Sequence, residues 1–467
     1  MKKLLFAFFV LIPFTASFGQ TILNSHPLEL KKSRNNHQIL TAVNLRKDIF
    51  AFASDKEKVN VLKYNKFLFF SDSISTNRPD KEYEFMGGYS FENNGNPCVY
   101  WASEDLKKLK SVTFDFENKT TKITDFQFAF TDESILNTFS ENNFFYILTL
   151  PKKDDQLKIY ALRKGERYEK TIDLSSYKFT DEKEKTLNFN ELILQNGLEM
   201  IDSKALNPLF QTVGKSKMYV EGNQMILTFD ATSQTQVLKI DLNTFSVSEQ
   251  IIPQQMLIKT GKSNSYFHQN KLYQLKVNAE ELAVAAIDLK SGEILKKYYA
   301  DTKDTISFRN SPLLTQTGSQ SGKPIKNTKK FLQRLDTSEI GISVYQTKNE
   351  TMLTVGGVKN VNTTGGILLG ITAGSAMIAT GAGGDISSFF NDGTLQSNYF
   401  EGLFDAKFEH QNVAQLPLAF DAISQFLSEN NVTLQSVFSF ENYYILSYYD
   451  SKKKEFVMRK FEDATDF

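Results

Sequence analysis

The sequence contains a single cysteine, Cys98, among 467 residues, and it carries no excess of charge of either sign. One cysteine excludes an intrachain disulfide framework and any cysteine-rich zinc or iron–sulfur site. Because 54 Lys and Arg residues balance 54 Asp and Glu residues, the chain has no global field that would steer it onto nucleic acid or an anionic membrane. Hydrophobic residues make up 41% of the sequence, which is ample for a globular core.

Residue patterns typical of catalysis and metal binding are also scarce. The histidines form no HExxH motif or other close metal pair, and we expect them at the surface or in turns; they are His26, His37, His268 and His410. Residues 318–323 (Gly-Ser-Gln-Ser-Gly-Lys) resemble a nucleophile elbow and a phosphate loop, but Gln320 occupies the nucleophile position and the glycine spacing is one residue short. The sequence therefore predicts no catalytic residue, no cofactor and no metal ligand.

The first 19 residues are typical of a cleaved secretory signal. Lys2 and Lys3 precede an apolar stretch over residues 4–14, and Ser17 and Gly19 place small side chains before a cleavage site at Gln20. The apolar stretch is too short to span a bilayer, although a retained N-terminal anchor is the alternative. We expect an exported protein that resides in the periplasm, associated with the outer membrane.

Residues 20–467 consist of short apolar runs separated by turns rich in Asn, Gly, Asp and Lys, which is the pattern of an all-β fold. Four segments share a strand, a turn containing Asn, and a second apolar strand; they are residues 141–148, 221–227, 268–275 and 440–446. Asn96 and Asn143 lie 47 residues apart, as do Asn223 and Asn270. A four-stranded unit of that length predicts a β-propeller of six to eight blades, most simply seven, in one domain.

Three further features refine this prediction. The 80 residues between Asn143 and Asn223 exceed one blade, and the excess includes an expected short helix over residues 192–206. The last unit shows only three strands, so residues 22–30 are expected to supply the fourth and close the ring. Residues 419–427 have the apolar spacing of an amphipathic helix packed on the ring. A pair of β-sandwich domains is the alternative architecture.

A glycine-rich apolar insertion over residues 360–397 interrupts a late blade. Residues 360–384 carry no charge, and residues 365–384 contain seven Gly and four Ala. Gly366, Gly370 and Gly374 repeat every four residues, a spacing that lets another backbone approach closely on a helix. An exposed apolar segment needs a cover, so we expect a partner to bind here. The alternatives are a disordered or internally packed loop, a segment that lies against the membrane, and a membrane-spanning helix. The expected partner-binding residues are Gly366, Leu369, Gly370, Ile371, Gly374, Met377, Ile378 and Gly381.

With its signal, its repeat and this insertion, the chain resembles the plug-type propeller subunits of the type 9 secretion translocon of Gram-negative bacteria. The resemblance implies a non-enzymatic protein that binds an outer-membrane or secretion-complex protein, without nucleic acid, and associates with the membrane through that partner. Two alternatives stay open. One is a propeller enzyme, a hydrolase or lyase, and the other is a ligand-binding protein with its site on the central channel.

Overall fold

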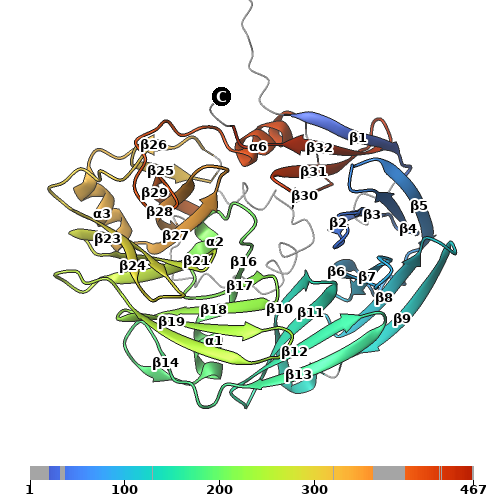
Figure 1. Cartoon of the computed structure of the whole chain (residues 1–467), viewed down its shortest axis with the longest axis horizontal. Coiled ribbons are helices and arrows are strands. Elements are labelled where there is room, and N and C mark those ends of the chain that lie inside the picture. Colours follow the sequence, from blue (N-terminus) through green and yellow to red (C-terminus); the bar gives the residue numbers. More distant parts are fainter. Residues whose placement is uncertain are drawn as a thin grey trace, which may run out of the picture.

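The computed structural model describes residues 20–31, 37–128, 130–318, 320–360, 395–430, 432 and 434–464. The expected signal peptide and all eight expected partner-binding residues lie outside these described residues. Seven sheets of four or five strands surround a central axis (Figure 1). The chain is therefore a seven-bladed β-propeller, which confirms the predicted fold and overturns the pair of sandwich domains.

The first three blades follow one another along the chain, and each runs from its innermost to its outermost strand. Blade 1 contains β2 (Gln38–Val43), β3 (Ile49–Ser54), β4 (Lys58–Tyr64) and β5 (Phe70–Asn77). Blade 2 contains β6 (Phe85–Phe91), β7 (Pro97–Ala102), β8 (Lys108–Asp115) and β9 (Thr120–Gln127). After the short helix η2 (Phe130–Asp132), blade 3 contains β10 (Glu133–Glu141), β11 (Phe144–Pro151), β12 (Gln156–Arg163) and β13 (Glu166–Asp173).

Blades 4 and 5 follow after a longer connection that holds β14 (Phe179–Thr180), β15 (Thr186–Leu187) and the helix α1 (Phe189–Asn196). Blade 4 has five strands, which are β16 (Glu199–Ile201), β17 (Ser216–Glu221), β18 (Gln224–Asp230), β19 (Gln234–Asp241) and β20 (Val247–Pro253). The helix α2 (Leu209–Thr212) lies between β16 and β17 in the chain. Blade 5 contains β21 (Lys262–His268), β22 (Lys271–Val277), β23 (Glu281–Asp288) and β24 (Ile294–Asp301).

The last two blades take their outermost strands from elsewhere in the chain. In blade 6, β25 (Leu314–Thr317) pairs with β29 (Leu395–Phe404), and β28 (Thr351–Asn360) and β27 (Glu339–Gln346) lie further inward. The short β26 (Lys323–Pro324) extends this sheet, and α3 (Thr328–Asp336) leads into β27. After α6 (Ala419–Asn430), blade 7 contains β30 (Gln435–Phe440), β31 (Tyr443–Asp450) and β32 (Glu455–Phe461), completed by β1 (Thr21–Pro27).

The ring closes as the sequence predicts. β1 pairs antiparallel with β32 from Thr21↔Lys460 to Pro27↔Glu455. The amphipathic helix is confirmed as α6, which buries Ala419, Ile423 and Phe426 against blade 7. No helix within the described ranges is long and apolar enough to cross a bilayer.

Tight turns explain why the repeat is visible in the sequence. Asn142, Asn143 and Asn270 adopt left-handed backbone angles between β strands, with φ of 49°, 65° and 60°, and Asn tolerates this conformation better than most residues. The apolar faces of neighbouring blades then pack together; for example, Tyr100 of blade 2 stacks on Phe145 of blade 3 with ring centroids 4.8 Å apart. The core is therefore a series of layers between blades, and Cys98 is buried within one of them.

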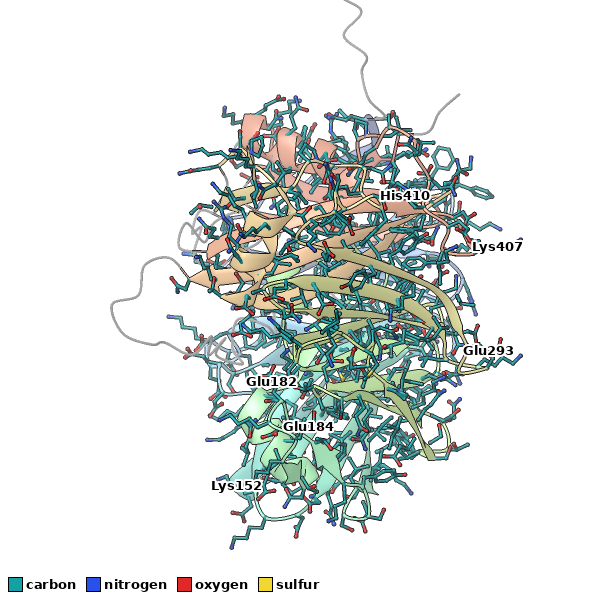
Figure 2. The ribbon with its side chains drawn as sticks, turned by 90° about the vertical axis from the view of Figure 1, so that its left-hand side faces the viewer. Lys152, Glu182, Glu184, Glu293, Lys407 and His410 are labelled. Carbon is teal, nitrogen blue, oxygen red and sulfur yellow. The ribbon has the colours of Figure 1, made fainter. Side chains whose placement is uncertain are left out.

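The two faces of the ring are built from different connections. Within each blade we count the strands from the innermost one outward, starting at β17 in blade 4. The turns after the first and third strands form one face of the ring, which we call the bottom face. The opposite face is the top face. Figure 2 shows the ring from its edge, with Lys152, Glu182 and Glu184 toward the top face and Glu293, Lys407 and His410 toward the bottom face.

The helix expected over residues 192–206 is wrong in its position. The helix α1 begins after Asn188, whose side chain accepts a hydrogen bond from Glu191 N, and it ends at Gly197 with φ of 71°. A glycine in that conformation is a common helix end. The residues that follow form β16 instead of continuing the helix.

Candidate functional site

The central channel of the ring is occupied by the chain itself. Residues 197–215 leave the top face at the end of α1, run into the channel as β16, and return as α2 before β17 begins. β16 pairs in parallel with β17, from Glu199↔Lys217 to Ile201↔Tyr219. Figure 1 shows β16 and α2 inside the ring, in the place where an open propeller has its solvent channel. We call residues 197–215 the channel segment.

Four blades hold the channel segment by hydrogen bonds from side chains to its main-chain oxygens. Their donor–acceptor distances lie between 2.7 and 3.1 Å; the bonds run from Asn137 to Leu198 O, from Asn264 to Val213 O, from Ser343 to Asn207 O and from Tyr444 to Lys204 O. Asn207 itself donates to the hydroxyl of Tyr266 at 2.9 Å. Buried main-chain carbonyls need such partners. The side chains of the blades therefore supply hydrogen-bond donors to carbonyls that regular secondary structure leaves unpaired.

Two glycines of blade 6 allow α2 to lie directly against the sheet. A Cβ at Gly341 would lie 2.9 Å from Thr212 Oγ1 and 3.0 Å from Val213 Cγ1. A Cβ at Gly356 would lie 2.9 Å from Leu209 Cδ2 and 2.2 Å from the carbonyl oxygen of Asn398. The missing side chains are therefore a requirement of close packing between α2, β27 and β28.

A cavity of about 260 Å³ remains where the channel opens on the bottom face. The inner strands of blades 1, 2, 3 and 7, the channel segment and the end of β17 line it. Glu141 and Lys204 form an ion pair of 3.4 Å at this mouth, and Tyr89, Phe139 and Phe438 supply aromatic wall. The mixture of charged, amide and aromatic groups is suited to a small polar ligand or to a side chain of a partner.

Buried charges lie beside β16, near the start of the channel segment. Lys217 and Asp230 form an ion pair of 3.1 Å with both side chains fully buried. Asp230 also accepts hydrogen bonds from Ser265 N at 2.9 Å and Thr235 Oγ1 at 2.8 Å, so its lone pairs are satisfied. Burial raises the pKa of Glu199, the β-pair partner of Lys217, to about 7, although the charge of Lys217 opposes this shift.

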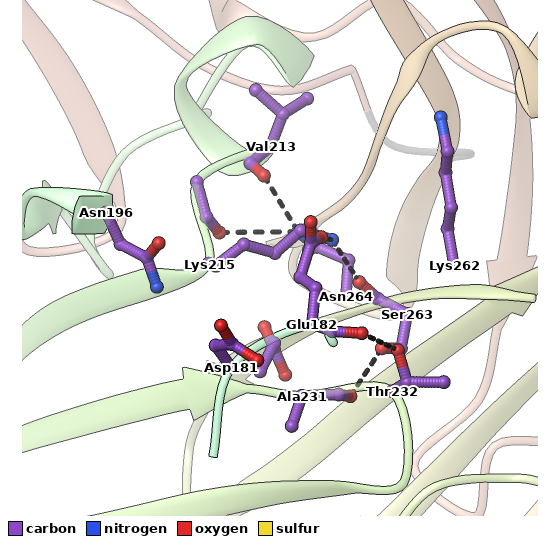
Figure 3. Close-up of polar contacts among 12 residues, drawn as sticks. Asp181, Glu182, Asn196, Val213, Lys215, Ala231, Thr232, Lys262, Ser263 and Asn264 are labelled. Atoms are coloured by element: carbon purple, nitrogen blue, oxygen red, sulfur yellow. Dashed lines mark hydrogen bonds and ion pairs between the residues drawn. The ribbon is translucent and has the colours of Figure 1, made fainter. Parts of the chain in front are cut away.

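The top end of the channel segment is fixed by a second polar cluster (Figure 3). Lys215 forms an ion pair of 2.7 Å with Glu182 and donates to Ser263 O at 2.6 Å. Lys262 donates to Ser338 O at 2.7 Å, which ties blade 5 to the end of α3. These lysines neutralise carbonyl dipoles and a carboxylate, and their role in this arrangement is structural.

The glycine-rich insertion enters and leaves the described structure at one place. β28 and β29 stay paired to their last residues, Asn360↔Leu395. They extend beyond the inner strand, because β27 begins with the pair Glu339↔Val358. Residues 361–394 therefore start and finish on adjacent strands at the top face of blade 6, as the sequence predicts.

The histidines are distributed as expected with one exception. His26 stacks on Phe70 with centroids 4.0 Å apart, and His410 lies beside the turn at Asp405. His268 ends β21 at a turn but is buried, and burial lowers its pKa to about 4. In the described part of the chain no group of three His, Cys, Asp or Glu side chains is arranged to hold a metal ion.

The channel contacts were not visible in the sequence. Asn137, Asn264, Ser343 and Tyr444 are single polar residues in strands, and nothing in their spacing marks them. The excess length between Asn143 and Asn223 was the only indication of the channel segment in the sequence, because it indicates residues that do not belong to a regular blade.

Comparison with known proteins finds only distant likenesses to solved structures. No family model and no curated protein matches the sequence. A prolyl endopeptidase structure matches 92% of this chain at 9% identity with a TM-score of 0.35, and this chain spans about half (51%) of its length. The Dos1 propeller matches 90% of this chain and 77% of its own at 9% identity and a TM-score of 0.29. The WD40 domain of SCAP from fission yeast matches 96% of this chain and 98% of its own, at 9% identity and a TM-score of 0.32. Since likenesses this distant carry no argument about activity, the propeller assignment stands on the seven sheets themselves.

Proposed function

We propose that this chain is an exported, non-enzymatic β-propeller that binds an outer-membrane or secretion-complex protein through its glycine-rich insertion. The observation that supports it most is the pairing of β28 and β29 up to Asn360↔Leu395. A rigid sheet fixes both ends of a segment whose residues 361–384 are uncharged and rich in glycine and aliphatic side chains, and a loop on a rigid scaffold is a common way to present a binding surface. Within the insertion we assign the contacts to the eight residues from Gly366 to Gly381 named above.

The filled channel supports a binding role over catalysis. Propeller sites are assembled from residues of several blades around the channel, and here those residues hold the channel segment instead. The ring is thereby a preformed support whose side chains already bind main-chain oxygens of the channel segment, which suits a protein whose exposed segment contacts a partner.

Deletion of residues 362–388 tests the proposal. We expect the variant to keep its unfolding transition and circular dichroism but to lose co-purification with its partner from detergent-solubilised envelope. A matched control replaces the turn at residues 347–350, at the other end of the β27–β28 hairpin, by Asn-Gly; this variant should retain the partner. Unchanged co-purification after the deletion would defeat the proposal.

The cavity at the bottom mouth supports a second candidate, a ligand-binding protein. Its volume of about 260 Å³ and its pairing of Glu141 with Lys204 suit a small polar ligand. A thermal-shift screen of polar metabolites tests it, because a ligand bound there should raise the unfolding temperature of the native chain and not that of Lys204→Ala.

A further inference from the structure

Two turns at the bottom face of blade 1 expose large apolar side chains. Leu45 in the β2–β3 turn is 76% exposed, and Phe67 and Phe69 in the β4–β5 turn are each 68% exposed. Ile22 on β1 is also exposed, and β1 contacts this turn because Asn24 donates to Leu68 O at 3.3 Å. The two turns are two strand spacings apart, about 10 Å, and we call these exposed side chains together the apolar tips.

The backbone holds the apolar tips rigidly. Asn65 Oδ1 accepts hydrogen bonds from Phe67 N at 2.9 Å and Phe69 N at 3.2 Å. Leu68, between the two phenylalanines, has a left-handed backbone with φ of 66° and is buried in the core. The buried leucine anchors the turn, and its two aromatic neighbours are left projecting outward. Little conformational entropy remains to be lost when something contacts them.

The same turn occurs on this face with charged residues, not aromatic ones, at the two projecting positions. Asp405 Oδ1 accepts from Lys407 N and Glu409 N, and Phe408 at the anchor position has φ of 62° and is buried. Lys407 and Glu409 thus occupy the positions that Phe67 and Phe69 occupy in blade 1. The turn geometry does not require aromatic side chains at these positions, and exposing them opposes solubility unless something covers them.

Two cationic residues, Lys66 and Arg46, belong to the turns that carry the apolar tips. The Lys66 ammonium lies 5.1 Å from the ring centroid of Phe67, and Arg46 follows Leu45 in its turn. Neither Lys66 nor Arg46 forms an ion pair with a described residue, whereas Lys47 is paired with Glu441 at 2.7 Å. Aromatic and aliphatic tips beside free cations match the layered chemistry of a bilayer surface, with apolar chains below phosphate groups.

We propose that the apolar tips insert into the interfacial region of a lipid bilayer. The tips protrude from convex turns, and a fluid lipid surface accommodates separate protrusions, whereas a protein partner would need a complementary groove for each. Because only a few side chains enter, the binding is reversible and comparable to that of a single acyl chain, on the order of 10⁴ M⁻¹. The bottom face then lies on the membrane, opposite to the face from which residues 361–394 emerge.

Vesicle binding of the full chain tests this proposal independently of the partner. The probes are vesicles of phosphatidylcholine alone and of phosphatidylcholine mixed with phosphatidylglycerol. The variant Phe67→Lys/Phe69→Glu copies the turn at residues 405–409, so it should fold normally while its lipid-bound fraction falls about tenfold or more. Met256→Lys/Ile258→Glu makes the same charge change at exposed apolar residues of the connection between blades 4 and 5 on the top face, and it should bind as the native chain does.

A fluorescence measurement tests the proposal even if Phe67→Lys/Phe69→Glu does not fold normally. Trp101 is the chain's one tryptophan and is buried, so Phe67→Trp adds an exposed reporter to a constant background. Its emission should shift to shorter wavelength with vesicles and should be quenched by brominated lipid. The proposal is overturned by an unshifted reporter, by equal losses in both charge variants, or by binding that survives Phe67→Lys/Phe69→Glu and disappears when residues 362–388 are deleted.

Discussion

At the scale of single residues, Glu199 is a carboxyl group whose titration is changed by burial. It lies on β16 inside the ring, and burial raises the pKa of its carboxyl to about 7. Its β-pair partner Lys217 is held by Asp230 at 3.1 Å. Glu199 therefore lies beside a cation whose charge is already neutralised. This explains why the rise in its pKa caused by burial exceeds the lowering caused by Lys217.

We predict that Glu199 makes the ring less stable as the pH rises. The unfolded chain releases this proton near pH 4.5, whereas the folded chain keeps it up to about pH 7. Between these values the folded state binds more protons than the unfolded state, so its free energy of unfolding falls with increasing pH, by up to about 3 kcal/mol. Glu199→Gln should remove this slope and should be more stable than the native chain at pH 8, as measured by urea denaturation at pH 5 and pH 8.

His268 supplies an opposite trend that the measurement must separate. Burial lowers its pKa to about 4, so its contribution is present above pH 6.5 and is lost as the pH falls toward 4. Because His268 is intact in both proteins, the difference between native chain and Glu199→Gln isolates the carboxyl. Equal slopes in the two proteins would contradict the prediction.

Sequence reasoning was effective for residues with a backbone role and ineffective for residues with a packing role. Asn142, Asn143 and Asn270 were predicted as turns because a left-handed backbone selects few residue types. Ser343 was not recognised, because a serine within a strand has the same local pattern whether it faces water or holds Asn207 O. This contact joins residues 136 positions apart in the sequence.

At the scale of elements, the packing of α2 on blade 6 decides whether the channel is filled. The three atoms nearest to the Cβ of an alanine at position 341 would all belong to the channel segment: Thr212 Oγ1, Val213 Cγ1 and Leu209 Cδ1. At Gly356 it would also meet the backbone of β29. Gly341 is thus the position at which the channel segment can be perturbed without direct damage to the sheet.

We predict that Gly341→Ala destabilises the chain by about 1–3 kcal/mol through overpacking. Thr212→Ala removes the closest atom and should restore part of the loss in the double variant, giving a measurable coupling energy. Gly214→Ala is the control, because its Cβ would have ordinary contacts of 3.6 Å or more. Additive effects of Gly341→Ala and Thr212→Ala in urea denaturation would show that the two residues do not meet.

The elements of the channel segment could not be predicted from their own residues. β16 has three residues and α2 has four, which is too short for a periodic pattern. The expected helix over residues 192–206 followed the apolar residues and overlooked the capping pair Asn188 and Glu191 and the helix end at Gly197. By contrast, α6 has 12 residues with one apolar face and was predicted correctly.

At the scale of the whole molecule, the ring depends on one pairing between distant strands. β1 covers the outer edge of β32, and its Asn24 and His26 also contact blade 1 through Leu68 O and the Phe70 ring. The predicted residues 22–30 and the observed Thr21–Pro27 agree because a blade with three strands leaves an edge that some other segment must cover.

We predict that removing residues 20–27 lowers the unfolding temperature and promotes aggregation. The loss exposes the backbone groups of β32 and the outer layer between blades 7 and 1, and an open edge pairs with other chains. Scanning calorimetry and light scattering measure the two effects. A synthetic peptide of residues 20–31, added in trans, should reverse both, and a peptide with the same residues in scrambled order should not.

The pairing of Thr21 with Lys460 also sets the order of assembly. During synthesis β1 is made early and waits for β32 until nearly the whole chain exists, so the ring cannot close on a partial chain. Contacts this far apart form late, although the entropy of closing a longer loop grows slowly with its length. Under the export that we propose, this delay withholds the closing step until the last blade has crossed the membrane.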